Sequence, residues 1–174
     1  MVVAYRGGLN FKSISRSESP PDRFPLLALL SALAVYILLL SGSYVTATGA
    51  LAACPDWPLC RGVSLPSTEL SMIHMLHRIA AALIGVLVLY TLHLGFRDRS
   101  RSAEIRLISS LAAVAFLAQV LIGAMSIWLG FPVEFRALHL ALATAVWVLV
   151  AALAIVGLSG PGNNPDIVAT PAEE

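Results

Sequence analysis

Charged residues are scarce in this chain. Lys, Arg, Asp and Glu together make up only 12% of its 174 residues, and apolar residues make up 58%. A soluble domain would carry about 25% charged residues, so this composition excludes an ordinary soluble domain and indicates a multi-pass membrane protein. The chain also lacks a basic stripe with interleaved aromatic residues, so we expect no nucleic-acid partner.

Four apolar windows are long enough to cross about 30 Å of hydrocarbon, which takes roughly 20 helical residues. They cover about residues 26–47, 70–96, 107–129 and 137–158. We therefore expect an all-α fold, a four-helix bundle over residues 25–159 that lies in the lipid bilayer. We expect a flexible basic arm over residues 1–24 and a disordered tail over 160–174. The first window starts too far into the chain, and lacks a small-x-small site, for a cleaved signal peptide.

The basic residues predict the orientation of the helices. Four lie before the first window, namely Arg6, Lys12, Arg16 and Arg23. Four more follow the second window, namely Arg97, Arg99, Arg101 and Arg106. The loops after the first and third windows contain one each, Arg61 and Arg136. The positive-inside rule then predicts that both termini are cytoplasmic. In a cell membrane, the loop after the first window would lie on the outer face.

That outer loop contains both cysteines, in the segment Cys54-Pro-Asp-Trp-Pro-Leu-Cys60. Their spacing does not match a CxxC redox motif, and a zinc site would need two further ligands nearby. The pair could be a structural disulfide on the oxidising side of the membrane or a redox-active pair. Trp57 between them could anchor the loop at the membrane interface or cover the edge of a cofactor.

Two histidines, His77 and His139, each lie a few residues inside an apolar window at the same predicted face. An ionisable residue within the membrane indicates a functional site, and two at similar depth could clamp one metal, with haem iron the obvious candidate. The alternative is two unrelated histidines that each bond a backbone carbonyl. His93 lies sixteen residues after His77, about 24 Å along a helix, and cannot share that metal.

Several polar residues accompany this pair. Arg78 and Arg136 could bind haem propionates or extend to the interface, since arginine suits both. His74 could be a proton donor, an alternative ligand or an interfacial residue. Gln119, in the middle of the third window, needs an internal partner, either another helix or a bound ligand.

Taken together, residues 26–158 resemble the haem A synthase family. The resemblance rests on Gly49-Ala50 before the Cys54–Cys60 segment, on His77-Arg78, on Gln119-x-x-x-Gly123 and on His139. It implies a membrane oxidoreductase that converts the methyl group of haem O to the formyl group of haem A. It also implies His77 and His139 as axial ligands of haem b or haem O, and a Cys54–Cys60 disulfide.

The chain departs from the family pattern in two ways. Family members usually contain two four-helix halves, whereas this chain contains one, so we expect a homo-oligomer. The family glutamate three residues before the second-helix histidine is replaced by His74, so His74, Glu69 or Asp56 would have to assist proton transfer. Haem is the expected substrate and haem O synthase a possible partner. The alternatives are a non-catalytic bis-histidine haem b protein or accessory subunit, and a thiol–disulfide enzyme.

Overall fold

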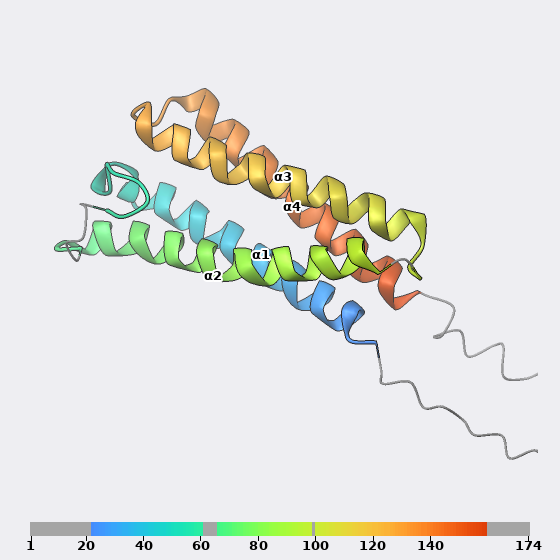
Figure 1. Cartoon of the computed structure of the whole chain (residues 1–174). Coiled ribbons are helices and arrows are strands. Elements are labelled where there is room, and N and C mark those ends of the chain that lie inside the picture. The colour runs from blue at the N-terminus through green and yellow to red at the C-terminus, as the bar shows by residue number, and fades with distance from the viewer. Residues whose placement is uncertain (1–21, 61–65, 99, 160–174) are drawn as a thin grey trace, which may run out of the picture.

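Four long α-helices make up most of the structure, a computed structural model that describes residues 22–60, 66–98 and 100–159 (Figure 1). The elements are α1 (Phe24–Ala47), the short 3-10 helix η1 (Ala50–Ala53), α2 (Glu69–Arg97), α3 (Ala103–Trp128) and α4 (Val133–Leu158). Each α-helix is long and apolar enough to cross a membrane, and the described residues contain no strand. The predicted all-α, multi-pass four-helix fold is confirmed. The expected tail, and the expected arm up to residue 21, lie outside the described residues.

Local sequence signals fix where the helices start. Pro25 occupies the first turn of α1, where its missing N–H is not needed. Thr68 and Ser71 form a capping box at α2, with Ser71 N 3.2 Å from Thr68 Oγ1 and Thr68 N 3.1 Å from Ser71 Oγ. Ser102 caps α3 by accepting a hydrogen bond from Ile105 N.

Each long helix packs against two others, so that α2 and α4 lie diagonally opposite each other, as do α1 and α3. The loop that follows α1 and the starts of α2 and α4 lie at one end of the bundle, which we call the histidine end. The start of α1 and the turn from α2 to α3 lie at the other, the arginine end (Figure 1). Arg101 in that turn pairs with Asp22 at 2.9 Å and covers the ring of Phe24. Which end faces the cytoplasm stays a prediction.

The tightly packed core occupies the half of the bundle near the arginine end. Its members are Phe24, Ala28, Ala32, Val35, Val88, Leu92, Ile105, Ala112, Val146, Val150, Leu153 and Ala154. A buried hydrogen bond between the hydroxyls of Ser31 and Thr91 joins α1 to α2 within this half. Toward the histidine end, the stretch of α4 before Val146 has no fully buried residue. The α1–α2 and α3–α4 hairpins spread apart toward that end in the view of Figure 1.

Candidate histidine-pair site

The two predicted ligand histidines lie at similar depths. His77 follows the first residue of α2, Glu69, by eight residues, and His139 follows the first residue of α4, Val133, by six. These separations correspond to about 12 Å and about 9 Å along the helix axes. The rings are half-buried and within electrostatic range of each other. Because α2 and α4 are diagonal, the two histidines approach the bundle interior from opposite sides.

Contacts with α1 determine the state of the His77 ring. Its Nδ1 lies 2.7 Å from Ser41 Oγ, and the Ser41 hydroxyl donates to Leu38 O at 2.7 Å. When the single proton of that hydroxyl is directed to Leu38 O, Nδ1 of His77 is the donor to Ser41. This arrangement favours the tautomer with the proton on Nδ1 and the lone pair that a metal ligand needs on Nε2.

His139 is held in the same tautomer by α3. Its Nδ1 lies 3.2 Å from the backbone oxygen of Gln119, which can only accept, so Nδ1 donates. The Nε2 lone pair then accepts from the side-chain amide of Gln119 at 3.1 Å. Gln119 thus has the internal partner that its position required, and it covers the nitrogen that would bind a metal.

A glycine on the neighbouring helix makes room for each ring. A β-carbon at Gly42 of α1 would lie 3.1 Å from Cε1 of His77, and one at Gly123 of α3 would lie 2.8 Å from Cε1 of His139. Both glycines are followed seven residues later by another, Gly49 and Gly130, with φ of 73° and 75°. Such left-handed φ values favour glycine. The two hairpins are therefore built alike around their histidines, a repeat that the sequence reading did not detect.

His74 and Arg78 serve the cysteine loop instead of the histidine pair. Nδ1 of His74 donates to Ala50 O at 3.2 Å, and its Nε2 accepts from Arg78 Nη2 at 3.3 Å. Arg78 also donates to the backbone oxygens of Cys54 at 2.8 Å, of Asp56, and of Pro58 at 3.4 Å. The guanidinium predicted to bind a propionate is therefore occupied by the loop in this structure.

The same loop carries the two cysteines. Cys54 and Cys60 are joined by a disulfide with a Cα–Cα distance of 4.5 Å, and both side chains are buried. Trp57 contacts Trp128 of α3 edge to face, with 5.7 Å between ring centroids. The loop thus connects the two hairpins at the histidine end.

The other predicted site residues either lie apart from the histidine pair or have a buried polar atom without a hydrogen-bond partner. Glu69 and Asp56 are exposed, and no hydrogen bond of either side chain to a histidine is present among the described residues. Arg136 is half-buried, and its Nε is buried without a hydrogen-bond partner. Oε1 of Gln119 is likewise buried and unpartnered. The structure therefore brings His77, His139 and Gln119 together and leaves the predicted carboxylates outside.

These residues fit the axial ligation of a haem. The two imidazoles come from opposite sides of the bundle, and each has an Nδ1 partner that fixes its ring, as ligating histidines usually do. Nε2 of His77 has no hydrogen bond among the described residues, whereas Nε2 of His139 would have to release the Gln119 amide to bind a metal. Buried polar atoms without partners, on Gln119 and Arg136, leave further hydrogen-bonding capacity beside the pair. Arginine donors of this kind suit carboxylates.

The fold and site define a multi-pass helical membrane protein with a paired-histidine site. Residues 66–151 match a family model described as cytochrome oxidase assembly protein, COX15-CtaA. The protoheme IX farnesyltransferase of Halobacterium salinarum is 34% identical over 141 residues, which cover 79% of this chain and 30% of that protein. The heme A synthase of Bacillus cereus is 34% identical over 117 residues, which cover 65% of this chain and 37% of that protein.

A third relative, protoheme IX farnesyltransferase 1 of Natronomonas pharaonis, is 34% identical over 147 residues, 80% of this chain and 31% of that protein. The match to the COX15-CtaA model and the likeness to heme A synthase support the resemblance to the haem A synthase family that the motifs indicated. It spans about a third of the length of the curated relatives that it matches.

Proposed function

We propose that this protein binds haem between His77 and His139 and acts in haem A synthesis. The observation that carries the proposal is the matched setting of the two rings. Each Nδ1 is held by a partner on the neighbouring helix, which favours Nε2 as the ligand atom; at His139 that nitrogen would exchange the Gln119 amide for the metal. Two unrelated histidines, each bonded only to a backbone carbonyl, would have no reason to lie at the same depth along their helices, to face a glycine of the neighbouring helix and to favour the same tautomer.

The names of the relatives support haem as the ligand. The matched segment occurs in proteins named heme A synthase and in proteins named protoheme IX farnesyltransferase. The two names describe different reactions, but both refer to haem. A common segment of about a third of each protein is therefore best explained as a haem-handling unit, and a haem O synthase is the natural source of the substrate.

The finer proposal is oxidation of the haem O methyl group to the formyl group of haem A. Bound haem would supply the iron and the porphyrin methyl, and the chain would hold it between two neutral imidazoles. Conversion of the methyl group to the formyl group takes up one water and releases four protons and four electrons, so it needs an external electron acceptor as well as a nearby base. His74 is the nearest of the three proposed bases to the pair, and it would have to exchange its hydrogen bond with Arg78 to accept a proton.

A non-catalytic haem b protein is the second candidate, and the contacts of the proposed bases favour it. Both ring nitrogens of His74 have partners in or near the cysteine loop, and Glu69 and Asp56 are exposed. In this case haem b would be bound by the same histidines without conversion. A thiol–disulfide enzyme is less well supported, because both cysteines are buried and an attacking thiolate needs access to a sulfur.

The test is haem identity in protein purified after co-expression with a haem O source. The first proposal predicts a bis-histidine spectrum and haem A in the extracted haems, and the second predicts the same spectrum with haem b alone. His139→Ala should abolish that spectrum under both. His93→Ala is the matched control, because His93 is an exposed histidine of α2 near the arginine end. An unchanged spectrum in His139→Ala would contradict both proposals.

The assembly and orientation are also proposed. A single four-helix unit offers one histidine pair, so a homo-oligomer would supply further sites. The positive-inside rule would place the cysteine loop on the outer face, where the Cys54–Cys60 disulfide would persist. Mass measurement of the detergent-solubilised protein and labelling of an introduced cysteine from either side of sealed vesicles test the two statements separately.

A further inference from the structure

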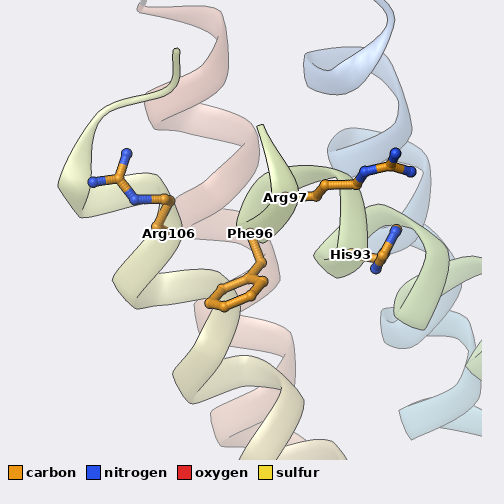
Figure 2. Close-up of a pocket in the computed structure, with 4 residues that line it drawn as sticks. All are labelled: His93, Phe96, Arg97 and Arg106. Carbon is orange, nitrogen blue, oxygen red and sulfur yellow. The ribbon is translucent and has the colours of Figure 1, made fainter. Parts of the chain in front are cut away.

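A basic hollow lies at the arginine end, away from the histidine pair. Its volume is about 710 Å³, and it is lined by His93, Phe96 and Arg97 of α2 and by Arg106 of α3. Figure 2 shows Phe96 between Arg106 and the neighbouring pair of His93 and Arg97. Arg97 is the last residue of α2, and Arg106 lies in the first turns of α3, so the hollow opens where the spanning helices leave the hydrocarbon.

The two arginines of the hollow have no acidic partner within the described part of the chain. Both ion pairs found there involve Arg101, which binds Asp22 and Asp98. The guanidinium of Arg106 is oriented by donating through Nη1 to the backbone oxygen of Arg101. Arg97 and Arg106 thus border the hollow on opposite sides of Phe96, and neither has an ion-pair partner among the described residues (Figure 2).

The rim of the hollow has an apolar part. The side chain of Phe96, which lines the hollow, is 60% exposed. A ligand here would have one arginine on either side of Phe96, whose ring offers a surface suited to hydrocarbon. Cations are repelled by such a site, and a small hydrophilic anion would leave the apolar rim unused.

We propose that this hollow binds the phosphodiester headgroup of an anionic phospholipid, with the acyl chains against Phe96. Arginine forks match phosphate oxygens in pairs, and basic pockets between membrane helices are suited to such headgroups. The site is independent of the haem proposal, since it shares no residue with the histidine pair.

The test measures lipid binding to the purified full chain in a neutral detergent. Short-chain phosphatidylglycerol and phosphatidylcholine are titrated, and bound lipid is counted by native mass spectrometry. We expect a preference for phosphatidylglycerol that falls about fivefold in Arg97→Gln or Arg106→Gln, because each arginine near a lipid surface contributes about that factor. Arg97→Lys should retain most of the preference.

Arg23→Gln is the matched control, because Arg23 is an exposed arginine at the same end that does not line the hollow. Its preference should stay within about twofold of the unmodified protein. An equal loss in Arg23→Gln would show unspecific surface attraction and overturn the proposal. Equally tight binding of inorganic phosphate would identify a soluble anion as the ligand, and no preference between the two lipids would exclude the site.

Discussion

Replacing Gly123 by alanine is the most direct test of the histidine geometry. The added β-carbon would lie 2.8 Å from Cε1 and 3.1 Å from Nδ1 of His139. Carbon atoms in contact prefer about 3.5 Å or more, so the ring would have to retreat from α3 by about 0.7 Å. Gln119, whose backbone oxygen fixes Nδ1 at 3.2 Å, is on the same helix, so the retreat also breaks that hydrogen bond.

The expected magnitude follows from how closely a ligating group must be held. Functional groups tolerate displacements of about 0.5 Å, and loss of the outer partner of a ligating histidine typically costs 10- to 100-fold in metal affinity. We therefore expect Gly123→Ala to weaken haem binding about 10- to 100-fold. Alanine raises the intrinsic stability of a helix by up to about 1 kcal/mol over glycine. The loss should therefore occur without loss of helical content.

The assay is haem titration of the apoprotein, followed by the absorbance of the bis-histidine complex, with circular dichroism as the check on folding. Gly42→Ala should have a smaller effect, because its β-carbon would lie 3.1 Å from His77 Cε1. Gly157→Ala is the control, since its nearest contact is 3.5 Å. A folded Gly123→Ala protein that binds haem as tightly as the unmodified protein would refute His139 as a ligand in this pose.

Three further outcomes follow. Ser41→Ala should weaken haem binding about 10-fold and broaden the spectrum, because His77 loses the acceptor that fixes its tautomer; spectral titration checks it. Cys54→Ser should lower stability by about 2 kcal/mol, the effect of opening a short loop, measured by denaturant unfolding under oxidising conditions. The hydrogen bond from Arg101 lowers the pKa of Asp22, so its contribution is present above the ordinary value of 3.8 and lost as pH falls through the lowered value. Asp22→Asn should therefore reduce stability at pH 7, by less than about 1 kcal/mol for so exposed a pair, and the difference should shrink as the pH falls below 3.8; thermal melts over this pH range check it.

The sequence predicted the four helices well but placed two of their starts too late. The third and fourth windows begin near residues 107 and 137, whereas α3 begins at Ala103 and α4 at Val133. Hydropathy detects contact with hydrocarbon, and the first turns of these helices carry Glu104 and Glu134. The Ser102 cap starts α3 before its apolar stretch does.

The histidine pair could be predicted from depth alone, but its partners could not. Ser41 and Gln119 meet their histidines through the packing of neighbouring helices, and the sequence contains no local signal for that register. The need of Gln119 for an internal partner was predictable, because an amide in hydrocarbon is costly. The contacts of Arg78 with the loop carbonyls were not predictable, because they join residues more than twenty positions apart. The expected role of Arg78 toward a propionate stays a prediction.

The unlike partners of the two histidines have a stereochemical consequence. The two faces of a haem macrocycle are mirror-related, and a site with identical ligands on both sides would not distinguish them. Here one face would meet an imidazole fixed by a hydroxyl, and the other an imidazole fixed by a backbone oxygen and bordered by an amide. A hairpin repeat that is equal in backbone and unequal in side chains therefore gives the site two chemically different sides, and a haem bound as proposed would meet a different environment on each face.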